Sequence, residues 1–108
     1  MSRATAPKGH ETQIRAIVFK EGDFYIAQCL EYDISAQAPA IEAVIDRLEL
    51  TIEAEFEACE EAGKEANKCI LPAPNYYHGL WEKRSLAVQR VSVEAPERPY
   101  NLQFALAA

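Results

Sequence analysis

Alternating hydrophobic and polar positions near the start of the chain predict a β-hairpin over residues 13–30. Ile14, Ala16 and Val18 alternate with their neighbours, and a second run rich in strand-forming residues follows after a turn-like Lys-Glu-Gly-Asp sequence. Residues 32–37 have the composition of a short third strand. The first part of the chain therefore predicts an antiparallel sheet.

A longer hydrophobic period begins after Pro39 and ends at Gly63. Proline suits the first turn of a helix and glycine suits the residue after its end. At 100° per residue, the large apolar side chains between them share a stripe roughly 120° wide. Its members are Ile41, Val44, Ile45, Leu48, Ile52, Phe56 and Cys59. This segment predicts one long amphipathic helix that packs on the sheet.

Weaker signals follow the helix. Residues 64–75 are expected to be irregular, residues 76–86 to form a short helix, and residues 88–93 and 100–106 to form a second hairpin. The predicted class is α+β, with an antiparallel sheet packed by the long helix, followed by a C-terminal short helix and strands. A chain of 108 residues supplies one core. We expect residues 1–12 to form a disordered tail and residues 13–108 to form a single domain.

The last predicted strand is strongly apolar and needs a partner, either in its own sheet or in another subunit, because a bare edge promotes aggregation. Ile17 and Phe19 lie on the second face of the first strand and also need cover. We therefore expect a homodimer or larger assembly. The candidate interface residues are Tyr100, Leu102, Phe104 and Leu106.

The chain has a formal net charge of −6, from 17 acidic and 11 basic residues. That sign disfavours direct binding to a phosphate backbone. Residues 40–63 contain eight acids and one arginine, a net charge of −7, so the other 84 residues sum to +1. The acidity therefore belongs to the predicted long helix.

Most of these acids project on the side of the helix opposite the apolar stripe. Neighbours four apart in such a row repel each other, so helix stability alone does not explain them. Leu50 lies among them, about 180° from Ile41 on a helix of 100° per residue. The row is interpreted either as a solvated face that maintains solubility or as a binding surface for a basic partner. The candidate partner-binding residues are Glu42, Asp46, Glu49, Leu50, Glu53 and Glu57.

Residue types that carry catalysis are scattered, and we expect no enzyme activity, cofactor or metal site. His10 and His78 have no patterned partner, and the four glycines form no phosphate-binding loop. Glu31 and Asp33 fit turn and capping roles better than a magnesium site. Trp81 is expected to be a core residue, although with Tyr76, Tyr77, Lys83 and Arg84 it also suggests a base-stacking cluster.

Cys29, Cys59 and Cys69 are odd in number and contain no closely spaced pair. An odd number of separated cysteines favours reduced, buried thiols over a disulfide framework. Their spacing is also not that of a usual zinc site. No apolar run approaches the length of a membrane span, and the first residues do not resemble a signal peptide. We therefore expect a cytoplasmic protein without a membrane segment.

Residues 14–18, the run from Phe24 to Gln37, and Glu42-Ala43 with Leu48 together resemble a HicB-type antitoxin domain. The likeness covers residues 13–63. It implies a small, oligomeric α+β domain with a partial RNase H-like or double-stranded-RNA-binding-like fold. Members of that family bind and neutralise a small basic RNA-cleaving toxin. The proline-containing C-terminal part does not resemble the DNA-reading helices that many members carry, so DNA binding is not implied.

Three hypotheses remain open at this point. The first is a non-enzymatic HicB-like antitoxin that neutralises a small basic protein. The second is an oligomeric scaffold of the same fold without a toxin partner. The third is a nucleic-acid-binding or degenerate nuclease-like domain that uses basic residues outside the long helix, such as Arg15, Lys20, Lys83, Arg84 and Arg90.

Overall fold

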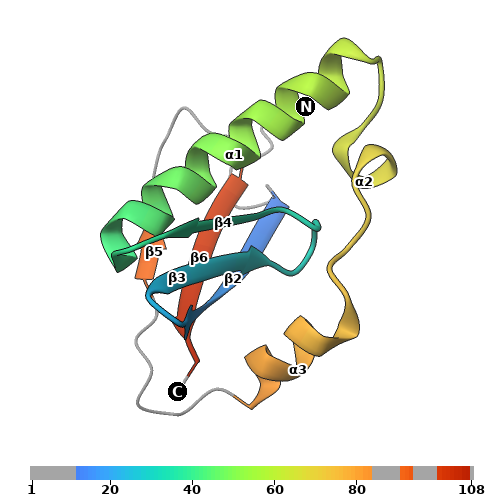
Figure 1. The fold of residues 1–108 in the computed structure, drawn as a ribbon. Coiled ribbons are helices and arrows are strands. Elements are labelled where there is room, and N and C mark those ends of the chain that lie inside the picture. Colours follow the sequence, from blue (N-terminus) through green and yellow to red (C-terminus); the bar gives the residue numbers. More distant parts are fainter. Residues whose placement is uncertain (1–11, 84–90, 94–99, 108) are drawn as a thin grey trace.

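The computed structural model describes residues 12–83, 91–93 and 100–107 and has an α+β fold (Figure 1). Its elements are β2 (Thr12–Glu21), β3 (Phe24–Cys29), β4 (Ser35–Ala38), α1 (Ile41–Glu61), α2 (Ala66–Cys69), α3 (Asn75–Glu82), β5 (Val91–Val93) and β6 (Tyr100–Leu106). The tail predicted over residues 1–12 lies outside the described residues except for Thr12, which already belongs to β2.

The predicted first hairpin and third strand are confirmed. Strand β2 pairs antiparallel with β3, and β3 pairs antiparallel with β4. Glu21 lies opposite Phe24, so only two residues form the turn. The first of them, Gly22, has φ of 63°, a conformation that glycine adopts without steric cost and that a tight hairpin requires.

The sheet is mixed, so the prediction of an antiparallel sheet is wrong in one respect. Its strand order is β4-β3-β2-β6-β5, and β6 runs parallel to β2. Parallel neighbours need a long crossover connection, and the segment that contains α1 separates these two strands. The predicted second hairpin is confirmed, because β5 pairs antiparallel with β6.

Helix α1 packs diagonally across one face of the sheet, against β3 and β4 (Figure 1). Its predicted apolar stripe is confirmed: Val44, Leu48, Ile52 and Cys59 are buried. The remaining stripe residues Ile45 and Phe56 are half-buried against the same core, and Ile41 is half-buried.

The two ends of α1 match their sequence signals closely. Pro39 precedes the N-cap Ala40, so it lies just outside the first turn in which the sequence placed it. Gly63 follows the C-cap Ala62 with φ of 74°, the left-handed conformation that ends many helices. The chain then reverses into α2, a single turn within the segment predicted to be irregular.

Part of the second face of the sheet is covered by α3, which overlaps the predicted helix over residues 76–86 but begins one residue earlier and ends at Glu82. Trp81 packs there with Ile17, Leu30 and Ala105. It is 5% exposed, which confirms its predicted role in the core. The second face of β2 therefore has its cover within the chain.

Candidate functional site

The outward side of α1 carries the candidate partner-binding residues predicted from the sequence. We call this surface the acidic face, defined by Glu42, Asp46, Glu49, Leu50, Glu53 and Glu57. Val44, Leu48 and Ile52 turn to the core, which sets these residues on the other side of the helix. Leu50 is 66% exposed at the edge of the row of acids. The structure thus brings all six predicted residues to one surface.

The charge of the acidic face is not balanced by its own helix. Arg47 is the helix's one base, and its guanidinium donates a 2.8 Å hydrogen bond to the backbone carbonyl of Gln37 in β4. No basic residue occupies the last turn of α1, where cations would favour the helix dipole. Acids four residues apart repel by about 0.2–0.5 kcal/mol per pair. The acidic face therefore costs helix stability, and Glu42, Asp46 and Glu57 are exposed to solvent.

The candidate interface residues of the last strand lie inside the chain's own core. Tyr100, Leu102 and Phe104 are at most 3% exposed, and Leu106 is half-buried beside them. Strand β6 is paired on both sides, with β2 and β5, so it is not a sheet edge. Of the two partners considered for this strand, its own sheet is the one observed. Self-association stays a prediction, but these four residues no longer require it.

Glu31 and Asp33 are engaged in structural contacts. The backbone N–H of Arg15 donates to one Glu31 carboxylate oxygen at 2.7 Å, and the Arg15 side chain donates to the other at 2.6 Å. The same guanidinium lies 5.5 Å from the centre of the Trp81 ring. Asp33 accepts a 3.0 Å hydrogen bond from the Gln28 amide. Within the described residues, no group of three or more His, Cys, Asp or Glu side chains could hold a metal ion.

The buried thiol of Cys29 is chemically quiet. Burial raises the pKa of this thiol far above its usual range, and the negative charge of Glu31 raises it further. The thiolate is the nucleophilic form of cysteine, so Cys29 stays protonated and unreactive at neutral pH.

The prediction that all three cysteines are reduced is wrong. Cys59 at the end of α1 and Cys69 at the end of α2 form a disulfide, with their Cα atoms 5.9 Å apart. That separation lies within the ordinary disulfide range. The chain reverses after Gly63, which brings residues ten positions apart into contact, a pairing that spacing alone did not reveal. Cysteine usage therefore no longer indicates a reducing compartment.

Stepwise alkylation should distinguish the three cysteines. We expect iodoacetamide to label no cysteine in the native protein, because Cys29 is fully buried and the other two are paired. A mild reductant should open two sites, and added denaturant should open the third. Intact-protein mass spectrometry counts the labels. Labelling of Cys69 without reductant would contradict the disulfide.

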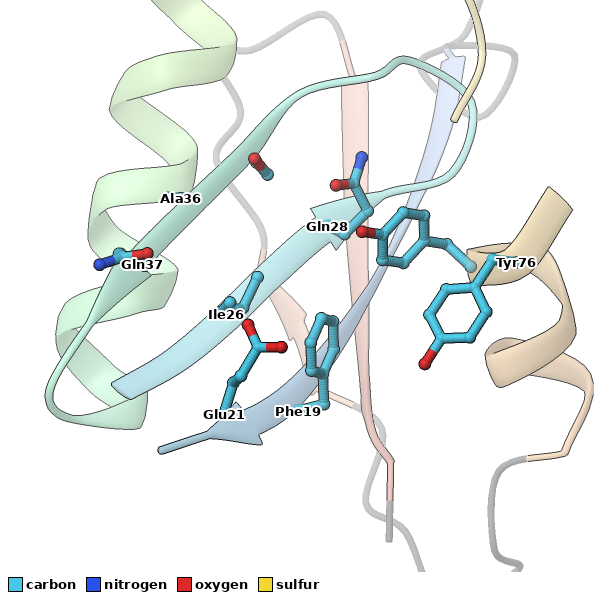
Figure 2. Close-up of a pocket in the computed structure, with 9 residues that line it drawn as sticks. Phe19, Glu21, Ile26, Gln28, Ala36, Gln37 and Tyr76 are labelled. Carbon is cyan, nitrogen blue, oxygen red and sulfur yellow. The ribbon is translucent and has the colours of Figure 1, made fainter. Parts of the chain in front are cut away.

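A pocket of about 400 Å³ lies on the sheet face opposite α1, between α3 and the β4 edge (Figure 2). Figure 2 shows Phe19 and Glu21 reaching into it from β2, Ile26 and Gln28 from β3, and Tyr76 from α3. Tyr77 also lines it. Of the aromatic residues considered for base stacking, Tyr76 and Tyr77 line the pocket, whereas Trp81 is buried in the core. The sequence gives no signal for this pocket, because its residues come from separate elements and form no motif.

No helix in the described part of the chain combines the length and apolar composition that a transmembrane span requires.

Comparisons with protein-family models, with curated proteins and with solved structures find no match to this chain.

Proposed function

We propose that the chain is a non-enzymatic, HicB-like protein-binding domain that uses the acidic face of α1 to bind and neutralise a small basic RNA-cleaving protein. The observation that carries this proposal is the composition of the acidic face. Its carboxylates lie beside Leu50, which is 66% exposed although the same helix buries its other leucine. A face that served only solubility has no need of a large apolar side chain beside its carboxylates.

The chemistry of the acidic face fits a cationic partner. Its row of carboxylates attracts Lys and Arg side chains, and Leu50 offers an apolar contact that a basic partner can desolvate. Complementary charge raises the association rate more than it raises the affinity. The gain in rate decreases as the salt concentration rises. The proposed complex should therefore form quickly at low ionic strength and weaken as salt is added.

We extend the proposal to the fold, as a partial RNase H-like or double-stranded-RNA-binding-like arrangement of the HicB type. Its support is the chain order: three antiparallel strands, the long helix, and a later strand that returns beside the first. In this proposal the protein acts in the cytoplasm, where an RNA-cleaving partner meets its substrate.

Capture from a lysate of the organism that encodes the chain is the first test. The tagged wild-type protein is compared with a neutralised variant that carries Glu42→Gln, Asp46→Asn, Glu53→Gln and Glu57→Gln. We expect the wild type to retain a small protein of basic isoelectric point at low salt, and to release it at high salt. The neutralised variant should retain at least about tenfold less, because it loses the complementary charge.

The purified captured protein is then assayed for RNA cleavage with and without the wild-type chain. Suppressed cleavage supports the proposal. A retained protein that is acidic, or that binds both variants equally, would overturn the assignment to the acidic face. Failure to retain any basic protein at either salt would remove the proposed function.

A further inference from the structure

The pocket on the sheet face opposite α1 is separate from the acidic face. Successive strand residues point to opposite sides of a sheet. Ala27 and Cys29 of β3 belong to the core beneath α1, whereas Ile26 and Gln28 line the pocket. A ligand in the pocket therefore occupies different residues from a protein bound to α1.

Glu21 is the one ionisable carboxylate in the pocket lining, and no Lys, Arg or His is among the lining residues. In the described part of the chain, its carboxylate has no ion-pair partner. The neighbouring Lys20 lies on the other side of the sheet, with its ammonium 5.7 Å from the Tyr25 ring centre. Negative ligands such as phosphates find no counter-charge here, and the pocket favours a positive one.

Aromatic rings from α3 and from β2 line the pocket together. The Tyr77 ring of α3 stacks on Phe19 of β2 with 6.2 Å between ring centres, and it lies edge-to-face with Tyr76 at 5.1 Å. Ring faces attract cations that carry alkyl groups, because such cations are weakly hydrated and benefit from both charge and apolar contact. The combination of rings with one carboxylate is the chemistry that recognises alkylated ammonium groups.

A fixed polar group completes the site. Gln28 is 4% exposed, and its amide nitrogen donates to the Cys29 carbonyl and to Asp33, each at 3.0 Å. These bonds fix the amide orientation. Among the described residues none donates a hydrogen bond to its carbonyl oxygen, which leaves that oxygen as an acceptor at the pocket (Figure 2).

We propose that this pocket binds a small, free organic cation with an alkylated ammonium head, held by the rings of Phe19, Tyr76 and Tyr77 and by the carboxylate of Glu21. A volume of about 400 Å³ suits a small molecule. The charge of the lining selects a cation over an anion or a neutral analogue. The binding is independent of the proposed protein partner.

Choline and its neutral isostere 3,3-dimethyl-1-butanol are matched probes for this site. Each is titrated into the full chain and followed by ¹H–¹⁵N NMR, with attention to Phe19, Ile26 and the side-chain amide of Gln28. We expect choline to saturate these signals with about fivefold higher affinity, the upper end of what one cation–π contact at an exposed site supplies. Equal binding of the two probes, or no saturable shift in these signals, would overturn the proposal.

Two variants assign the preference to the pocket. Glu21→Gln and Tyr76→Leu should each reduce the preference for choline at least about threefold. Tyr76 is 67% exposed, so its replacement should not prevent folding. Glu57→Gln on α1 removes the same charge elsewhere and should leave the preference unchanged. Shifts confined to α1, or an equal loss in the Glu57 variant, would show general attraction of cations to an acidic protein. A trimethyl-lysine peptide that binds more tightly than choline would reassign the pocket to a protein ligand.

Discussion

Replacing Leu48 with alanine is expected to lower the free energy of unfolding by about 2–5 kcal/mol. Leu48 is fully buried on the inner side of α1, between Val44 and Ile52 in the main core. Truncation loses the transfer free energy of the removed methyl groups and leaves a cavity that the rigid sheet beneath fills only in part. Urea denaturation followed by circular dichroism measures the change.

Leu50 provides a matched control for this prediction. It lies on the same helix and undergoes the same chemical change, but it is 66% exposed. Leu50→Ala should change the free energy of unfolding by no more than about 0.5 kcal/mol. Equal losses in the two variants would show that α1 does not bury the side that the structure assigns to the core.

Trp81→Ala is expected to cost about 3–5 kcal/mol, the range observed when a buried aromatic side chain is removed. Trp81 covers Ile17, Leu30 and Ala105 on the second face of the sheet, and it also carries the Arg15 guanidinium on its ring. Its loss removes the main apolar attachment of α3. Because α3 supplies the tyrosines of the pocket, the same variant should also weaken choline binding.

Tyr76→Ala is the control on the same helix, since Tyr76 is 67% exposed. Its effect on the free energy of unfolding should stay within about 1 kcal/mol, the size of one aromatic pair contact with Tyr77. Thermal and urea unfolding of both variants measure the difference. A Trp81 variant as stable as wild type would contradict the packing of α3 on the sheet.

Local patterns in the sequence predicted the parts of the fold that local physics determines. The alternation of Ile14, Ala16 and Val18 identified a strand with one face in the core, and a tight turn at Gly22 joined it to the next. The 100° periodicity of α1 identified which leucine is buried and which is exposed. Gly63 marked the helix end, because its backbone conformation is one that other residues adopt only at a cost.

Pairing between distant segments was not predictable in the same way. The apolar alternation of β6 fits a parallel or an antiparallel neighbour equally, and Ile14 lies opposite Leu102, far along the chain. That ambiguity left the partner of the last strand open between its own sheet and another subunit, and led to the prediction of a subunit interface at Tyr100 and Phe104. In the structure β6 lies between β2 and β5, so both of its edges are hydrogen-bonded within the sheet. The side chains of Tyr100 and Phe104 are buried without a second subunit.

The two sites differ in how far the sequence revealed them. The acidic face is a property of one helix, so helical projection placed Glu42, Asp46, Glu53 and Glu57 together before any fold was known. The pocket requires β2, β3, β4 and α3 to meet, and the Cys59–Cys69 disulfide requires the chain to reverse after α1. Neither arrangement leaves a periodic trace in the sequence.

The association rate between this chain and its captured basic partner tests the central claim most directly. Stopped-flow measurements compare wild type, the neutralised variant of α1 and a control with Glu21→Gln, Asp23→Asn, Glu65→Gln and Glu82→Gln, which removes four exposed acids outside α1. The neutralised variant should fold normally, because it relieves repulsion within the helix. At low salt we expect its association rate to fall by about tenfold or more, with a weaker salt dependence, while the control stays within about threefold of wild type. Equal losses in the two variants, or no loss in either, would contradict a partner-binding role for the acidic face.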